Sequence, residues 1–323
     1  MTHPAGSSRT EEGSTSVLIT GGCGFIGTNL THFLGVRGYS VTILDDLSNP
    51  SEAWAAGRMP EDNVRLVEGD ISDSAALSEA LVGVSSVVHL AACTDVIGSL
   101  QDPWEAWRVN VGGALNLMEC CRKASVGRLV FASSNAVPGN HVLPARESAV
   151  AAPLSVYGAS KLAGEALCSA YYHSFGLDTF CLRFSNCYGP HSERKTSVVN
   201  RFMVALMNGS SLIVYGDGTQ TRDFVHVDDV CQAIHLAMSS DMKGGQVFHI
   251  GSGVETSVGD LASMLSELFG RAPEIEYRPK RRGEIERIYS DITLARELLG
   301  FVPKVTLEDG LRQLCNWHKT KSP

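Results

Sequence analysis

The stretch "VLITGGCGFIGTNL" (residues 17–30) joins an apolar run, a glycine-rich turn and the start of an amphipathic segment, with glycines at 21, 22, 24 and 27. A glycine lets the backbone turn tightly and approach a phosphate group without a Cβ clash. A helix that begins at such a turn offers unpaired N–H groups and the positive end of its dipole to an anion. The order of strand, glycine turn and helix therefore predicts a binding site for the pyrophosphate of a dinucleotide.

Acidic residues at the ends of the next two apolar runs support this interpretation. The run "SVTILD" ends at Asp45, which lies 18 residues beyond Gly27. A carboxylate at this distance accepts hydrogen bonds from the adenosine ribose diol and would repel a 2′-phosphate. Asp70 and Ile71, at the end of the third run, suit the adenine. We therefore expect the cofactor NAD rather than NADP.

Short apolar runs alternate with longer helical patterns over the first part of the chain, from residues 16–20 to 178–186. Fully apolar, β-branched strands that alternate with helices indicate a parallel sheet covered on both faces. The pattern predicts an α/β fold with a Rossmann-like, doubly wound parallel sheet. A barrel of alternating strands and helices is the alternative, and the glycine-rich first turn disfavours it.

Beyond residue 186 the pattern becomes irregular, with helical stretches at 196–208 and 259–269 and a strand-like stretch at 212–217. These elements indicate a smaller C-terminal α/β lobe that closes a cleft against the sheet. The expected organisation is a disordered tail over 1–15, an NAD-binding domain over 16–186 whose sheet also receives segments near 220–251, and a substrate-binding lobe made of 187–219 and 252–323.

Composition excludes several classes of partner. The chain of 323 residues has a net charge of −8, which gives no broad attraction to nucleic acid or to an anionic membrane. No apolar run approaches the roughly 20 residues that span a bilayer, and the polar N-terminus lacks a signal sequence. The nine cysteines have no C-x-x-C spacing, which indicates free thiols and no metal site. We expect a cytoplasmic protein without nucleic-acid or membrane partners.

The segment "SVYGASKLAGE" places Tyr157 and Lys161 four residues apart at the start of a predicted helix. This spacing puts both side chains on one face. A nearby ammonium favours the phenolate, so we expect Lys161 to lower the pKa of Tyr157. The spacing alone is common, and an ordinary pair on a helix surface is the alternative. The glycine turn and Ser134, at the end of an earlier strand, favour a catalytic set.

The ordered motifs "TGGCGFIG", "LDDLS", "HLAA", "NVGGALNLMECC", "SSNAV", "YGASK", "LRFSNCYGP", "YGDGTQTRDFVHVDD" and "RRGE" cover the chain from about residue 16 to 315. Together they resemble the extended short-chain dehydrogenases/reductases of the nucleotide-sugar epimerase/dehydratase family. The resemblance implies that Ser134, Tyr157 and Lys161 are catalytic. It implies an NAD site made of Gly21, Gly24, Phe25, Ile26, Gly27, Asp45, Asp46, Ser48, Asp70, Ile71, Leu90, Ala91, Ala92, Thr94, Asn110, Tyr157, Lys161 and Phe184.

The resemblance also implies a site for a nucleotide-sugar, expected to be a UDP-sugar. Guanidinium groups bind phosphate with paired hydrogen bonds, so two arginines of this site would hold the diphosphate. A salt bridge with a neighbouring aspartate is the alternative for the first of them, Arg222. The basic side chain of Lys195 either reaches a phosphate or is solvated. The implied contacts are Ser134, Asn135, Tyr157, Asn186, Val198, Val199, Arg222, Arg281, Glu284 and Ile288.

The residues after Ser134 bear on the reaction. The family normally has a tyrosine at the position of Pro138, and the catalytic hydroxyl four residues before it corresponds to Ser134. Relatives that dehydrate or decarboxylate the sugar resemble one another in having acids directly after this hydroxyl, whereas this chain has Asn135 and Ala136. It therefore lacks the acid/base pair for elimination, which favours epimerisation at C4. Another reaction of the family, or a non-catalytic NAD sensor, is the alternative.

Two further expectations follow from the resemblance. Ile288 falls where the family sets the width of the pocket beside the C2 substituent, and its intermediate size slightly favours admission of an N-acetyl group. Helices over 104–124 and 157–175 would form a homodimer through a four-helix interface. The alternative is that these helices only cover the sheet of a monomer.

Overall fold

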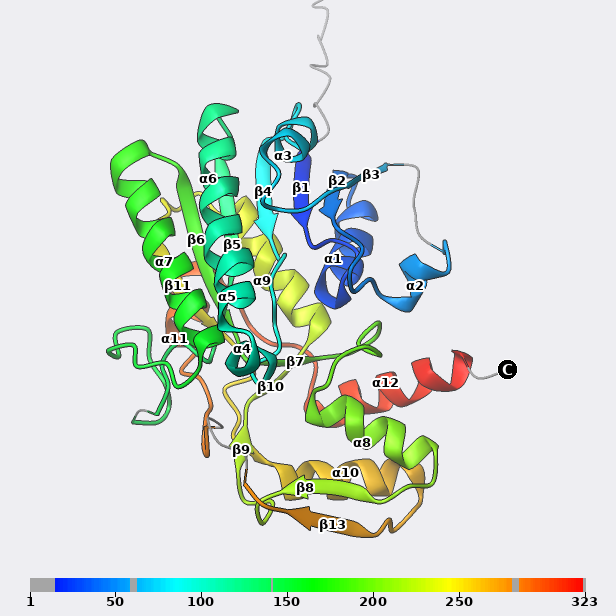
Figure 1. Cartoon of the computed structure of the whole chain (residues 1–323). Helices are drawn as coiled ribbons and strands as arrows, with labels where there is room; N and C mark the ends of the chain where they lie inside the picture. The colour runs from blue at the N-terminus through cyan, green and yellow to red at the C-terminus, as the bar shows by residue number, and fades with distance from the viewer. Residues whose placement is uncertain (1–14, 59–62, 141, 281–284, 322–323) are drawn as a thin grey trace, which may run out of the picture.

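The computed structural model of the chain describes residues 15–58, 63–140, 142–280 and 285–321. Its centre is a sheet of seven parallel strands in the order β11-β6-β5-β4-β1-β2-β3 (Figure 1). This arrangement confirms the expected doubly wound α/β fold. The strands are β1 (Ser16–Thr20), β2 (Ser40–Asp45), β3 (Val64–Glu68), β4 (Ser86–His89), β5 (Arg128–Ser134), β6 (Asp178–Phe184) and β11 (Gln246–Ile250).

Helices cover both faces of this sheet. Successive side chains of a strand point to opposite faces, so Val17 and Ile19 of β1 enter one apolar core and Leu18 enters the other. All three are fully buried, as expected for a central strand. The first face is covered by α1 (Phe25–Gly35), α9 (Val227–Ser239) and α11 (Thr293–Leu299), and the second by α3 (Ser74–Ala80), α6 (Ala114–Lys123) and α7 (Val156–Phe175).

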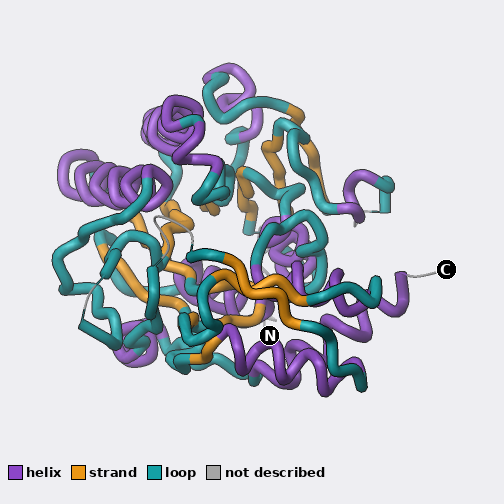
Figure 2. The backbone as a smooth tube through the Cα atoms, turned by 60° about the horizontal axis from the view of Figure 1, so that its bottom comes forward, coloured by secondary structure: helices purple, strands orange, loops and turns teal. Residues whose placement is uncertain are grey.

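A third apolar core lies in the C-terminal part of the chain. Figure 1 shows its elements below the sheet, and Figure 2 brings them forward. The two helices and the strand predicted here from sequence are confirmed, with ends shifted by one or two residues. The precise boundaries of the two domains stay a prediction. The elements are α8 (Val198–Met207), β8 (Leu212–Tyr215), α10 (Val258–Phe269), β13 (Ile275–Arg278) and α12 (Leu307–Lys321).

The helix expected over 104–124 is interrupted. The structure has α5 (Pro103–Trp107), a π-helical turn η1 (Arg108–Gly113) and then α6. Such turns concentrate at functional sites because they redirect a side chain. Here Asn110 binds the loop after β4 on both sides: its Oδ1 accepts from the Cys93 amide (2.8 Å) and its Nδ2 donates to the Cys93 carbonyl (3.1 Å).

The remaining elements are short. No helix in the described part of the chain is both long and apolar enough to cross a bilayer. All nine cysteines are free thiols. The short elements are α2 (Glu52–Ala55), α4 (Gly98–Gln101), β7 (Asn186–Tyr188), β9 (Thr221–Arg222), β10 (Phe224–His226) and β12 (Thr256–Ser257).

Candidate active site

A cavity of about 830 Å³ opens at the carboxyl ends of the central strands. At this place β1 lies between β2 and β4, so the chain leaves neighbouring strands in opposite directions and a crevice forms between them. The wall combines loops of the sheet with residues of α7, α8, β8 and β9. Its volume suits a small organic ligand.

The glycine turn after β1 forms one end of this cavity. Gly21 has φ +71°, and a Cβ there would lie 2.7 Å from the amide nitrogen of Ala91. A Cβ on Gly27 would lie 2.4 Å from the carbonyl oxygen of Gly21. Both positions therefore require glycine. Helix α1 begins directly after Gly24, and no side chain caps its first amides, so they are available to an anion.

Asp45 is fixed at the end of β2 beside this turn. Its Oδ2 accepts from the Cys23 amide and its Oδ1 from the Leu47 amide, each at 2.9 Å. Burial raises the pKa of the carboxyl, and the two backbone hydrogen bonds act against that effect. Each carboxylate oxygen has a second lone pair for a hydroxyl donor. A pyrophosphate cradle followed by an oriented ribose acceptor fits a dinucleotide.

Arg108, which sequence reasoning missed, organises the next part of the wall. It forms paired hydrogen bonds with Glu105, each at 2.8 Å, and its Nη1 lies 3.7 Å from Oδ2 of Asp70. The hydrogen bonds from Ser72, and to a smaller degree Arg108, lower the pKa of Asp70. Nothing in the sequence separated this arginine from a solvated helix residue. Gly21–Gly27, Asp45 and this cluster are called the glycine-turn half below.

The other half of the cavity is built where α7 meets the end of β5. Tyr157 lies in the first turn of α7, and Ser134 is the last residue of β5. Lys161 donates from Nζ to the Ala132 carbonyl (2.9 Å), with its Nζ 5.9 Å from the centre of the Tyr157 ring. A Cβ on Gly164 would lie 2.2 Å from the ring of Phe131, so the helix packs directly on the strand.

The electrostatics of this pair correct one expectation. Burial lowers the pKa of Lys161 to about 8. The pKa of Tyr157 is raised rather than lowered, because burial penalises the phenolate and only the hydrogen bond with Ser134 acts in the opposite direction. Lys161 does not offset this rise, and its ammonium donates to the Ala132 carbonyl of β5.

A buried ion pair behind these residues was also missed. The Glu165 carboxylate accepts from Arg183 through two hydrogen bonds of 2.8 Å, and its Oε1 also accepts from the Ser133 hydroxyl at 2.5 Å. Both charged side chains are 5% exposed. Glu165 follows Lys161 by one helical turn, so three successive turns of α7 are tied to the end of β5. The sequence offered only a lysine–glutamate spacing, which is common on helix surfaces.

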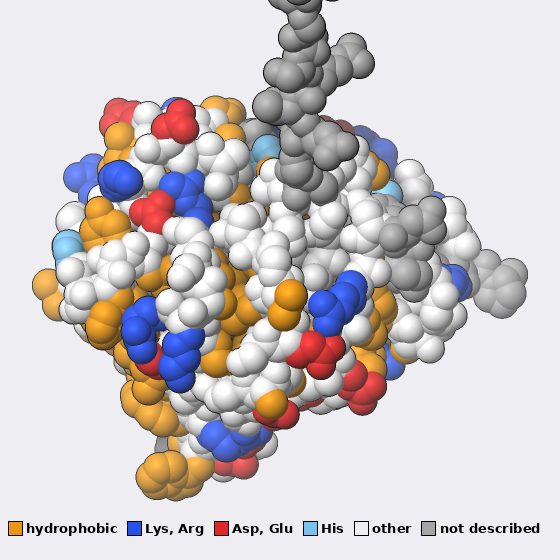
Figure 3. Space-filling model, turned by 90° about the horizontal axis from the view of Figure 1, so that it is seen from above, with side chains coloured by type: hydrophobic (Ala, Val, Ile, Leu, Met, Phe, Trp, Pro, Cys, Tyr) orange, Lys and Arg blue, Asp and Glu red, His pale blue; other side chains and the backbone are white. Residues whose placement is uncertain are grey.

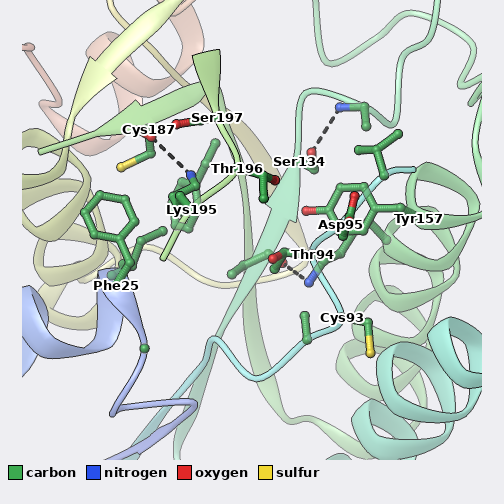
Figure 4. Close-up of a pocket in the computed structure, with 18 of the residues that line it drawn as sticks. Phe25, Cys93, Thr94, Asp95, Ser134, Tyr157, Cys187, Lys195, Thr196 and Ser197 are labelled. Atoms are coloured by element: carbon green, nitrogen blue, oxygen red, sulfur yellow. Dashed lines mark hydrogen bonds between the residues drawn. The ribbon is translucent and has the colours of Figure 1, made fainter. Parts of the chain in front are cut away.

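Figure 4 shows the two halves of the cavity in one view. Lys195 donates to the Cys187 carbonyl (3.1 Å) and lies 5.1 Å from the centre of the Phe25 ring, so it belongs to the cavity rather than to the solvated surface. The opposite side, called the tyrosine half below, contains Ser134 and Tyr157 with Thr94 and Asp95 from the loop after β4.

The part of the wall expected to hold the sugar nucleotide contains two linked amides and an arginine. Asn135 donates from Nδ2 to Oδ1 of Asn186 (3.2 Å). Arg222 lines the cavity from β9 and donates to the Thr221 carbonyl (2.8 Å). Its neighbour Asp223 is fully buried and accepts from the backbone and hydroxyl of Ser252, each at 2.7 Å. The Asp223 carboxylate therefore fixes the loop after β11, which contains Ser252.

Most residues predicted for the site lie in the wall of this cavity. Two do not. Asn110 is buried behind the wall, where it supports the Cys93 backbone, and Val199 packs in the third core. Arg281 and Glu284 lie outside the described residues. Those in the wall are Gly21, Gly24, Phe25, Ile26, Gly27, Asp45, Asp46, Ser48, Asp70, Ile71, Leu90, Ala91, Ala92, Thr94, Ser134, Asn135, Tyr157, Lys161, Phe184, Asn186, Val198, Arg222 and Ile288.

Known proteins resemble this chain over nearly its whole length. It is 37% identical over 311 residues to the UDP-glucose 4-epimerase of Mycolicibacterium smegmatis, covering 94% of this chain and 99% of that one. It is 32% identical over 312 residues to the dTDP-glucose 4,6-dehydratase of Streptomyces niveus, with coverages of 94% and 92%. The solved structure of MoeE5 in complex with UDP-glucuronic acid and NAD superimposes with a TM-score of 0.88 at 35% identity, with coverages of 95% and 100%.

The chain also matches one protein family over most of its length. Residues 17–251 match the "NAD dependent epimerase/dehydratase family". NAD is therefore the cofactor, and the glycine turn with Asp45 has the shape and the acceptor that this molecule needs. The matched segment contains the glycine turn, Ser134, Tyr157 and Lys161. On this evidence the chain belongs to the NAD-dependent epimerase/dehydratase family and is an enzyme that acts on nucleotide-sugars.

Proposed function

We propose that this enzyme epimerises a UDP-sugar at C4 through a transient 4-keto sugar. The observation that carries the proposal is the pairing of Ser134 and Tyr157 next to an amide rather than a carboxylate. Asn135 follows Ser134 and donates to Asn186, so the position that holds an acid in dehydrating relatives carries no ionisable group. Hydride removal and return at one carbon needs a proton acceptor on the hydroxyl but no second acid.

The chain's own residues take the following roles. Tyr157 accepts the proton of the sugar O4, and Ser134 shares that proton through its hydrogen bond with the phenol. Lys161, fixed by the Ala132 carbonyl, holds a positive charge beside the tyrosine ring and would bind the ribose of NAD. When bound, NAD supplies the hydride acceptor and donor, and its positive nicotinamide ring favours the phenolate. Arg222 binds the diphosphate, about which the keto sugar turns.

Two sugar pairs suit the proposal, the UDP-glucose and UDP-galactose pair and the corresponding N-acetylhexosamines. Ile288 is 3% exposed and lines the cavity. Its side chain is smaller than an aromatic ring, which supports room for an N-acetyl group. Replacing Ile288 with tyrosine should lower kcat/KM for UDP-N-acetylglucosamine more than for UDP-glucose.

The direct test follows the anomeric protons by NMR. The purified enzyme is incubated separately with UDP-glucose, UDP-N-acetylglucosamine and UDP-glucuronate. A new anomeric signal of the C4 epimer, which reaches the same ratio from either epimer, is the expected result. A 4-keto-6-deoxy product or a pentose would contradict the proposal and show that a carboxylate elsewhere performs elimination or that the enzyme decarboxylates.

We further propose that the enzyme is a homodimer through α5, α6 and α7. Large apolar side chains are exposed on these helices, with Trp104 83% exposed and Phe175 56% exposed. Figure 3 shows hydrophobic side chains gathered on the side where α6 and α7 lie in Figure 1. Sedimentation velocity should give twice the chain mass, and Trp104→Glu should shift the enzyme toward the monomer.

We also propose a cytoplasmic location. The free cysteines support a reducing compartment of this kind.

A further inference from the structure

Five carboxylates of the described residues line the cavity, and they are distributed unequally. Four lie in the glycine-turn half, at the ends of β2 and β3 or in the cluster around Arg108: Asp45, Asp46, Asp70 and Glu105. The fifth, Asp95, follows β4 and stands in the tyrosine half (Figure 4). It is exposed toward the cavity, and none of the proposed catalytic steps uses it.

Asp95 is fixed relative to the catalytic tyrosine. Its Oδ1 accepts from the Ile97 amide (2.9 Å), and its carbonyl accepts from the Ser99 amide (2.9 Å). The Ser99 hydroxyl in turn accepts from the Tyr157 amide (3.1 Å). One turn of chain and one hydrogen bond therefore connect the carboxylate to the start of α7. Its position does not depend on a flexible loop tip.

The second oxygen of this carboxylate is available to a ligand. Oδ2 of Asp95 accepts no hydrogen bond from the described residues, and no described cation pairs with it. Of the basic side chains in the wall, Arg108 pairs with Glu105 (2.8 Å), and Lys161, Lys195 and Arg222 donate to carbonyls. Arg194 and Arg201 also line the cavity, but no ion pair among the described residues neutralises the charge of Asp95.

We propose that Asp95 determines substrate specificity by selecting a nucleotide-sugar with an uncharged sugar ring against one that carries a C6 carboxylate. The proposal rests on the epimerase function above. A sugar whose O4 reaches Tyr157 carries C6 on the carbon next to C4, so its C6 group enters the tyrosine half. A hydroxymethyl group can donate a hydrogen bond to Asp95, whereas a second carboxylate is repelled, most strongly where the cavity excludes water.

The test compares two substrates in matched variants. Steady-state kcat/KM is measured for UDP-glucose and UDP-glucuronate with the wild type, Asp95→Asn and Asp241→Asn. Asp241 is an exposed carboxylate outside the cavity wall, so its variant has the same change of net charge. We expect Asp95→Asn to raise the ratio of kcat/KM for UDP-glucuronate to that for UDP-glucose at least tenfold. Asp241→Asn should leave this ratio within twofold of the wild type.

Binding separates this proposal from the epimerase function. Calorimetry of UDP-glucose and UDP-glucuronate with each purified variant reports charge selection even if no sugar is turned over. A wild type that binds UDP-glucuronate as tightly as UDP-glucose, with no change in Asp95→Asn, would overturn the role of Asp95 and leave epimerisation intact. A 4-keto-6-deoxy product that Asp95→Asn fails to form would also overturn it, because Asp95 would then be an acid in an elimination.

Discussion

The two halves of the cavity are built in different ways. The core of the glycine-turn half, Gly21–Gly27, is one continuous stretch of chain, and its shape depends on backbone atoms that leave no space for a Cβ at Gly21 and Gly27. The tyrosine half joins the loop after β4, the end of β5 and the first turns of α7 through side-chain contacts. Backbone atoms fix the shape of the glycine turn, whereas single side-chain substitutions can change the tyrosine half.

Tyr157→Phe should give the largest difference between an effect on the tyrosine half, measured as kcat, and an effect on the glycine-turn half, measured as NAD affinity. Loss of the phenol hydroxyl removes the proton acceptor, and general acid–base catalysis contributes about 10³-fold to a rate, or about 4 kcal/mol in the activation free energy. We expect kcat for epimerisation to fall by about this factor while NAD affinity stays within about twofold. NMR initial rates and a fluorescence titration with NAD measure the two quantities. Retention of a tenth of the activity would remove Tyr157 from the mechanism.

Glu165→Gln tests the buried ion pair of Glu165 and Arg183 behind the tyrosine half. It leaves the Arg183 guanidinium buried without its counter-charge, so the free energy of unfolding should fall by about 3 kcal/mol. Glu79→Gln breaks the exposed pair with Arg65 (2.7 Å) and should cost less than about 1 kcal/mol. Urea denaturation measures both.

A refinement of this experiment distinguishes a positioning role from stability alone. The double variant Glu165→Leu/Arg183→Met removes both charges, and we expect it to regain most of the stability, since such replacements are often neutral. Its kcat should nevertheless stay below that of the wild type with an unchanged KM, because the tie between Ser133 and α7 is missing. Equal kcat would show that the ion pair only stabilises the fold.

Gly27→Ala should act on the glycine-turn half alone. The added Cβ would meet the Gly21 carbonyl oxygen at 2.4 Å, and overpacking of this kind costs about 2 kcal/mol. We expect NAD affinity to fall more than tenfold. Gly112→Ala is the control, since nothing lies within 4 Å of its added Cβ. Wild-type NAD affinity in Gly27→Ala would show that the turn can shift without loss of the cradle.

The smallest effect concerns the charge of Lys161. Its pKa in the folded protein is lowered to about 8, so between this pH and the ordinary lysine value the unfolded chain binds more protons than the folded one. Stability therefore rises with pH over this window, by about 1 kcal/mol per pH unit. Lys161→Met removes the effect. Urea unfolding of both proteins at pH 7.5 to 9.5 measures this effect. The free energy of unfolding of the wild type, minus that of Lys161→Met, should increase as pH rises. A difference that stays constant with pH would contradict the lowered pKa of Lys161.

Sequence patterns predicted a large part of this molecule. The glycine turn, Asp45 and the spacing of Tyr157 and Lys161 all depend on local geometry: a backbone that needs glycine, and side chains one helical turn apart. The lowered pKa expected for Tyr157 was wrong because burial raises it, and that burial arises only when α7 packs against the rest of the fold. Asn110 was expected in the NAD site, but it lies behind the wall, and the π-helical turn that holds it there left no sequence signal.

By itself, therefore, the sequence predicted the alternating α/β fold and the NAD cofactor, because strand–helix periodicity and the glycine turn are local patterns, whereas the catalytic residues stay a prediction. The tertiary structure decided which charges are buried, which are paired and which face the ligand. The pairing of Glu165 with Arg183 and the exposure of Asp95 beside Tyr157 arise when separate segments meet at the end of the sheet. Burial and distance set the strength of a charge, and neither can be read from the order of residues along the chain.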